Sequence, residues 1–295
     1  MKGISLVQIE DKTEEDIDAM ETSENAIIMC EESSTLPSAE ATVRQQSDMT
    51  GQHILSAALY ARMCLAIEED YLMQLKNGDI TKHEIFKSDV EHTAHAVSAI
   101  FATAAFLESS INKFLAQEAE YIESEVIRLF NETANQDNAT HSMLDSLTTK
   151  KVIIEQLEFA REKRDRNSIL EKFMYALALF GKGKIDKGTS PYKDVADIIN
   201  IRDALFHYKT RWVTYKGDPP MEVIGVKGIE SLMKERKFPL NPLMQDLSVS
   251  FFPNKCLGYG CIKWAIDKSV QFVEIFYEKI EQPNPFPDIR NHLIY

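Results

Sequence analysis

The chain has 295 residues and is 44% hydrophobic, so it can bury the core of one large domain or two small ones. Its net charge of −13 argues against a uniformly basic surface of the kind that binds nucleic acid over its whole extent. The sequence has neither 18 consecutive apolar residues nor a signal-peptide-like apolar core near residue 1, so we expect a cytoplasmic protein that does not contact a membrane.

The charge is distributed unevenly along the chain. Residues 1–48 carry 3 Lys+Arg against 12 Asp+Glu, a net charge of −9, and we expect an acidic tail that is mostly disordered or loosely docked. Residues 49–282 have the patterning of one helical domain, and residues 283–295 are expected to be a C-terminal tail. Within the domain, residues 150–237 carry 19 Lys+Arg against 13 Asp+Glu, so its middle is locally basic.

Apolar residues recur at helical spacing over most of the domain. The pattern predicts helices at about 53–76, 89–130, 147–180 and 254–280. The third of these is interrupted near 164–167. In the first helix we expect five residues to point inward: Leu55, Leu59, Met63, Ile67 and Leu72. Strand signals are nearly absent, with one short strand at 221–226, and prolines keep the segment before the last helix irregular. The sequence therefore predicts an all-α bundle of five to seven helices, several of them long and antiparallel.

Residues 190–212, SPYKDVADIINIRDALFHYKTRW, are predicted to form a central helix capped by Ser190. Arg202 falls in the middle of its apolar stripe, where a guanidinium needs a carboxylate, a partner chain or a phosphate. Glu108 is a candidate for that carboxylate, one turn before Asn112 at the edge of the preceding apolar face; alternatively Glu108 is a solvated flank residue.

Five residues after Arg202 lies His207, whose side chain titrates near neutral pH. RNA carries its own nucleophile, the 2′-hydroxyl, so its cleavage needs a group that moves a proton and a group that stabilises charge on phosphate. Histidine and arginine suit these two tasks without a metal or a cofactor. Five residues correspond to about 140° on a helix, so the two side chains converge only if the helix distorts or two chains face each other.

Further side chains near this pair are candidates for phosphate or RNA contacts. Tyr208 and Lys209 follow directly and are suited to base stacking and phosphate contact, although Tyr208 also fits a packing role. Lys182 and Lys184 lie in a Gly/Lys loop that leads into the central helix and are candidates for touching an anion. This loop is not a nucleotide-binding P-loop, because the required lysine before Ser/Thr and the preceding strand are both missing.

The four cysteines, Cys30, Cys64, Cys256 and Cys261, are not spaced like metal ligands. We expect reduced thiols, buried or free, and no bound metal.

The stretch IINIRDALFHYKT, which contains Arg202 and His207, resembles the motif of HEPN domains, helical modules found in many RNases and toxins. It is similar to the "LRNxLxHYK" form of a group of bacterial HEPN-like proteins, as are residues 102–114 and residues 251–277. The resemblance spans about 100 to 280. It implies an HEPN-like fold, a homodimer with a shared cleft, and Arg202 and His207 as the catalytic pair.

The resemblance leaves two functions open. One is a metal-independent endoribonuclease, a toxin or phage-defence effector with RNA as substrate and an antitoxin or regulatory protein as partner. The other is a non-catalytic module that binds a nucleotide, an RNA or a protein. Asp203 stands where asparagine is common in the group, and its negative charge beside a phosphate site favours the second function.

Overall fold

The computed structural model describes residues 48–79, 86–132, 138–159, 168–209, 215–216, 221–222, 228–247 and 249–293. The chain divides into two compact units, Met1–Asp48 and Met49–Tyr295. The predicted acidic tail therefore lies outside the described residues except for Asp48, and only the second unit is considered below.

The described part of the second unit is all-α apart from one two-stranded ladder. Its α-helices are α1 (Thr50–Asn77), α2 (Phe86–Glu132), α3 (Asn138–Phe159), α4 (Ile169–Leu179), α5 (Tyr192–Phe206), α6 (Ile229–Glu235), α7 (Tyr259–Ile280) and α8 (Ile289–His292), and a short π-helix, η2, spans Phe251–Lys255. The strands β1 (Tyr215–Lys216) and β2 (Met221–Glu222) pair antiparallel. The prediction of a helical bundle is confirmed.

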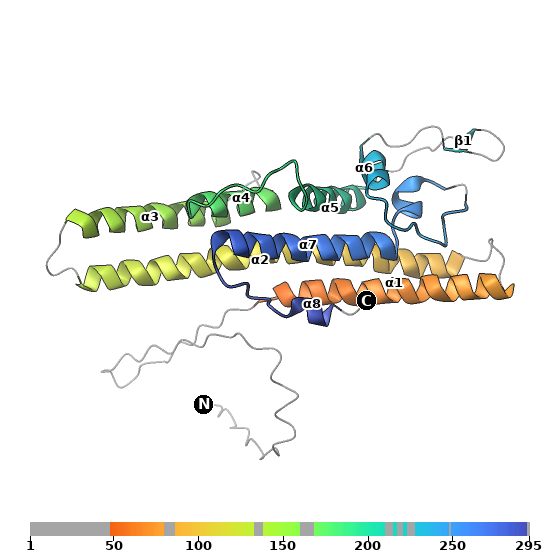
Figure 1. The fold of residues 1–295 in the computed structure, drawn as a ribbon, viewed down its shortest axis with the longest axis horizontal. Coiled ribbons are helices and arrows are strands. Elements are labelled where there is room, and N and C mark those ends of the chain that lie inside the picture. The colour runs from red at the N-terminus through yellow and green to blue at the C-terminus, as the bar shows by residue number, and fades with distance from the viewer. Residues whose placement is uncertain are drawn as a thin grey trace, which may run out of the picture. The chain divides into compact units, whose positions relative to one another are not determined.

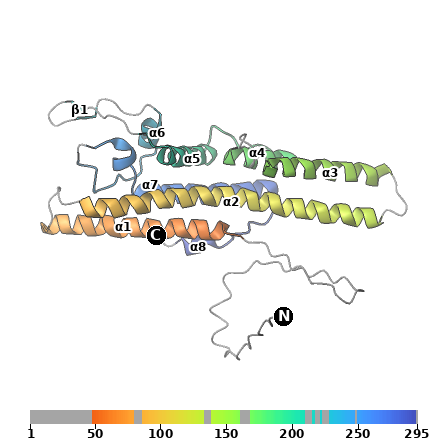
Figure 2. The ribbon, with the colours of Figure 1, turned by 180° about the vertical axis from the view of Figure 1, so that it is seen from behind.

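The helices are arranged around α2 and α7. Helix α1 runs antiparallel to α2 and packs on one side of these two helices, while α3, α4 and α5 lie on the other side (Figures 1 and 2). Helix α2 contacts α1, α3, α4, α5 and α7, so it is the central element of the fold. Its buried apolar residues recur at helical spacing: Ile100, Ala104, Leu107, Ile111, Leu115 and Ile122.

A cluster of aromatic rings joins α2, α4 and α7 in the core. The ring of Phe276 lies 5.1 Å from that of Phe114 and 4.9 Å from that of Phe173, both edge-to-face. Edge-to-face pairs place the positive edge of one ring on the negative face of another and add to the stabilisation that burial provides. Helix α7 also buries Ile262, Ile266 and Val273.

The inward face predicted for the first helix was wrong at three of its five residues. Leu59, Met63 and Leu72 are 45%, 41% and 47% exposed. Helix α1 instead buries smaller side chains, among them Ala57, Ala61 and Cys64. They face α2, which buries Ala96, Ala99 and Thr103, and small residues on both helices allow a close approach of the two backbones. Close packing of small residues thus decided the orientation, and the larger side chains point outward.

The two ends of the central helix differ from the prediction. Pro191 precedes the first residue of α5 without a side-chain cap, and the Ser190 hydroxyl lies 2.6 Å from Asp194 Oδ2. The helix ends at Phe206, and His207 is its C-cap residue. The predicted continuation to Trp212 lies outside the described residues from residue 210 onward.

The segment after Gln282, which we expected to be a separate tail, contains α8 and contacts the core. Phe286, Ile289 and Leu293 pack against buried core residues. On the surface, Arg290 donates two hydrogen bonds to Glu274 of α7.

Helix α2 contains the stretch Asp89–Phe130, which is long and apolar enough to cross a bilayer by length and composition. Core helices of soluble proteins meet the same criterion, and this stretch buries the apolar face described above.

The start of α7 lies close to the irregular segment before it, which leads to a testable prediction about Gly260. A Cβ atom at Gly260 would lie 2.6 Å from the backbone oxygen of Pro239. Replacing Gly260 with alanine should therefore lower the free energy of unfolding by about 1–3 kcal/mol, as overpacking does. Gly51, near the start of α1, has no atom within 4 Å of such a Cβ, so Gly51→Ala is the control and should be neutral or slightly stabilising. Urea unfolding of both variants measures the difference, and equal stabilities would contradict the close approach.

Candidate functional site

Arg202 and His207 both lie near the C-terminal end of α5. Helix α5 stays regular to Phe206, and the backbone N–H of His207 donates to the carbonyl oxygen of Asp203 at 2.9 Å. The His207 side chain is exposed, and Arg202 is half-buried with 27% of its side chain exposed. Because the helix is undistorted here, the five-residue separation turns the two side chains away from each other by about 140°.

Arg202 is paired with its own neighbour. Its Nε lies 2.8 Å from Oδ1 of Asp203, so the two side chains form an ion pair. The N–H group does not point at the carboxylate oxygen well enough for a hydrogen bond. The Nε atom is buried and has no hydrogen-bond partner among the described residues. The charge of the guanidinium is therefore largely compensated within one turn of α5.

Neither supporting residue predicted on α2 contacts Arg202. Glu108 is half-buried, and no ion pair joins it to Arg202 in the described ranges. The side-chain oxygen of Asn112 accepts a hydrogen bond from the buried Lys172 of α4 at 2.9 Å. The role expected for these two residues in orienting the arginine is thus not seen, and Asn112 satisfies a buried lysine instead.

The Gly/Lys loop lies at the other end of α5. Lys182 pairs with Glu281 at the end of α7, with 2.6 Å between Nζ and Oε2, and Lys184 is exposed. Helix α5, about 22 Å long at 1.5 Å per residue, lies between the end of this loop and His207. The expectation that these lysines lie near the Arg/His pair stays a prediction, and Lys182 is already paired with Glu281.

Aromatic and basic residues flank His207 in the chain. Phe206 is 70% exposed, and its ring lies edge-on to that of Phe101 on α2, with 6.1 Å between the ring centroids. Tyr208 and Lys209 are exposed as well, as their predicted roles require. The backbone carbonyls at this end of α5 carry partial negative charge, so an anion bound here would depend on these side chains and not on the helix dipole.

A buried ion-pair cluster that we did not predict lies on the other half of α5. Arg236, which follows α6, donates to both Asp194 and Asp197, and Lys268 Nζ of α7 lies 3.7 Å from Asp194. Both carboxylates are buried, and the guanidinium also lies over the Trp264 ring at 5.5 Å. In the sequence, the sign of this cluster was the pair of aspartates three residues apart. Their partner Arg236 is about 40 residues away in the chain, so sequence spacing did not connect it to them.

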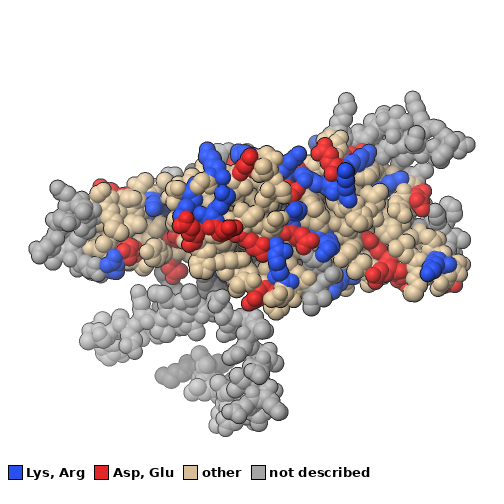
Figure 3. Space-filling model, in the orientation of Figure 1, with Lys and Arg blue, Asp and Glu red and all other residues tan. Residues whose placement is uncertain are grey.

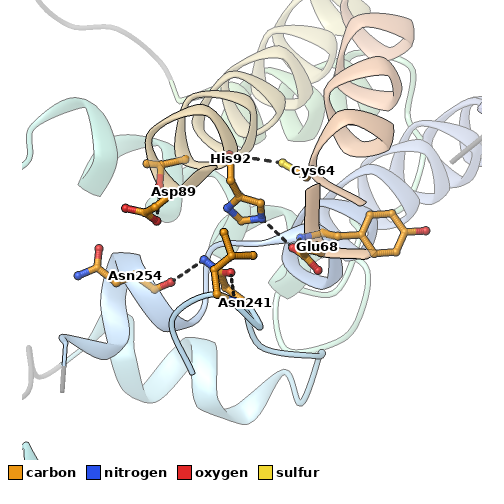
Figure 4. Close-up of polar contacts among 9 residues, drawn as sticks. Cys64, Glu68, Asp89, His92, Asn241 and Asn254 are labelled. Carbon is orange, nitrogen blue, oxygen red and sulfur yellow. Dashed lines mark hydrogen bonds and ion pairs between the residues drawn. The ribbon is translucent and has the colours of Figure 1, made fainter. Parts of the chain in front are cut away.

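A second polar cluster that the sequence did not indicate joins α1, α2 and α7 (Figure 4). One carboxylate oxygen of Glu68 lies 2.8 Å from Nε2 of the buried His92 and accepts the backbone N–H of Tyr259 at 2.7 Å. An ionised carboxylate only accepts, so Nε2 donates the proton, and Nδ1 is left buried without a partner among the described residues. Gly258 is needed beside this cluster, because its Cβ would lie 2.8 Å from Glu68 Oε1.

The thiols next to these clusters do not provide a nucleophile. Burial raises the pKa of Cys64 and of Cys256 to about 12, and it raises that of Cys261 well above the ordinary value. All three are buried and reduced, as predicted, and Cys30 lies outside the described residues. Within the ranges that the structure describes, no three His, Cys, Asp or Glu side chains form a group that would hold a metal ion.

Charges of both signs are interspersed on the face shown in Figure 3. The Lys and Arg side chains drawn in blue do not form a continuous basic surface on that face.

No known family model matches the chain, and no curated protein and no solved structure is significantly similar to it.

Proposed function

We propose that the chain is a metal-independent endoribonuclease of the HEPN type, in which Arg202 stabilises charge on the scissile phosphate and His207 moves the proton. The observation that carries the proposal is the placement of an exposed histidine at the end of α5, five residues after a half-buried arginine, in an all-α bundle. The exposed Tyr208 and Lys209 would contact the RNA beside it.

The active site in this proposal is shared between two chains. The regular geometry of α5 separates the side chains of Arg202 and His207 within one chain, so Arg202 of one copy would act with His207 of another across a cleft. The reaction would be attack of the 2′-hydroxyl on the adjacent phosphate, which leaves a 2′,3′-cyclic phosphate and a free 5′-hydroxyl. Such an enzyme would act in the cytoplasm as a toxin or phage-defence effector, held in check by an antitoxin or regulatory protein.

Cleavage of a mixed RNA panel in the presence of EDTA, followed by end-group analysis, tests the proposal. His207→Ala should lower the cleavage rate by at least about 100-fold, which is the lower limit for loss of a general acid or base. His141 of α3 is also exposed, so His141→Ala is the matched control and should cleave at the parent rate. An unchanged rate in a folded His207→Ala variant would show that His207 is not the proton-transfer group.

One observation favours the non-catalytic alternative. Asp203 already compensates the charge of Arg202 and adds a negative charge where phosphate would bind. A binding module would retain an RNA, a nucleotide or a protein without cleaving RNA. The substitution Asp203→Asn distinguishes the two functions, because it should increase cleavage by an enzyme and produce none in a binding module.

A further inference from the structure

The outward face of α1 carries an apolar stripe that the described chain leaves exposed. Leu59, Met63, Ala66 and Met73 lie within an arc of about 80° at 100° per residue. All four are exposed, and Met73 is 58% exposed. The other sides of α1 are occupied, because one packs on α2 and α7 and another, through Ile67 and Leu75, packs on the cluster around Leu243.

The charged residues on this face are arranged so that the stripe is complementary to itself. Arg62 lies on the N-terminal side of Ala66, and Glu69 and Asp70 lie on the C-terminal side, all exposed. Two copies of α1 that run antiparallel and cross at Ala66 would bring Arg62 of each copy opposite Asp70 of the other. The same symmetry brings Leu59 opposite Met73, because both are seven residues from Ala66. A parallel arrangement would instead bring like charges together.

We propose that the chain self-associates through α1, as an antiparallel two-fold contact centred on Ala66. An isologous contact of this kind needs one patch that is complementary to itself, and the pairs Arg62 with Asp70 and Leu59 with Met73 meet that requirement. The small side chain of Ala66 at the crossing point lets the two helices approach closely.

The contact is expected to be weak and dependent on concentration. From Leu59 to Met73 the stripe spans about 21 Å of helix, which gives less buried area than the roughly 800 Å² per partner of a standard stable interface. It is also separate from the proposed nuclease site, because α1 and α5 lie on opposite sides of α2 and α7 (Figures 1 and 2). A chain that uses both contacts would form even-numbered assemblies larger than a dimer.

Charge reversal in the full chain tests the proposal by sedimentation equilibrium at low salt. The symmetric contact contains two pairs of positions 62 and 70. In Arg62→Asp each of these pairs becomes two aspartates, and in Asp70→Arg each becomes two arginines. Each variant should self-associate about tenfold more weakly than the parent. An equimolar mixture of the two single variants should associate as the parent does, because in the mixed pair every charge at these positions again faces its opposite. The double variant should also recover.

The control is Lys263→Asp, which reverses an exposed charge on α7 and should leave association unchanged. A parent chain that stays monomeric at about 1 mM, or equal association of the parent, both single variants and their mixture, would overturn the proposal. None of these substitutions lies on α5. Loss of RNA cleavage would therefore not bear on the α1 contact, and failure of the charge reversals would not bear on the proposed function.

Discussion

Replacing Arg236 with alanine is expected to lower the free energy of unfolding by about 3–5 kcal/mol, as breaking a buried ion pair typically does. Arg236 is the residue that bridges Asp194 and Asp197, and both carboxylates are almost completely buried. Without the guanidinium, two negative charges three residues apart on α5 would keep, among the described residues, Lys268 at 3.7 Å from Asp194 and the hydroxyl of Ser190 as partners. Urea unfolding followed by circular dichroism measures the loss.

Arg290 provides the matched control for this prediction. It also makes two hydrogen bonds to a carboxylate, that of Glu274, but both side chains are substantially exposed. Arg290→Ala should cost no more than about 1 kcal/mol, the usual limit for an exposed pair. A loss from Arg236→Ala no larger than that from Arg290→Ala would mean that the cluster on α5 does not stabilise the fold.

Glu68→Leu is expected to have the second-largest effect on stability. It removes the acceptor for both His92 and the backbone N–H of Tyr259, and each buried group left unpaired costs about 1–3 kcal/mol. Because these groups belong to α2 and α7, the loss should loosen the junction of three helices. Thermal unfolding and hydrogen exchange at the first turn of α7 would detect it.

Two variants calibrate this prediction. Glu68→Gln keeps a side-chain acceptor oxygen and should lose less stability than Glu68→Leu. Glu69→Leu changes an exposed neighbour on the same helix and should stay within about 0.5 kcal/mol of the parent. If Glu68→Leu and Glu69→Leu were equally stable, the buried hydrogen bonds of Glu68 would not contribute to stability.

The sequence predicted α2 and α7 well because large apolar residues recur on one face of each. Ile111 and Leu115 on α2 and Phe276 on α7 are buried as their spacing indicates. Helix α1 was misoriented because Leu59 and Met63 lie on the side opposite to its small buried residues. Which face of α1 turns inward depends on how closely α2 approaches it. The residues of both helices together set that distance, so the sequence of α1 alone does not reveal it.

The polar contacts were harder to predict than the helices. Arg202 was correctly identified as an arginine that needs a carboxylate, but the carboxylate is the adjacent Asp203 and not Glu108. The pairing of Arg236 with Asp194 joins residues 42 positions apart, and no periodicity in the sequence indicates it. Lys182 was predicted to touch an anion from its nearness to α5 in sequence, yet it pairs with Glu281 at the end of α7.

Complementation between two inactive variants tests the central claim, a nuclease site shared by Arg202 and His207 of two chains, most directly. Arg202→Ala and His207→Ala would each be inactive alone. Mixing them should form heterodimers in which one cleft keeps both residues, so RNA cleavage should return to a fraction of the parent rate in the presence of EDTA. A mixture that exchanges subunits but remains inactive, while the parent cleaves, would contradict the shared site.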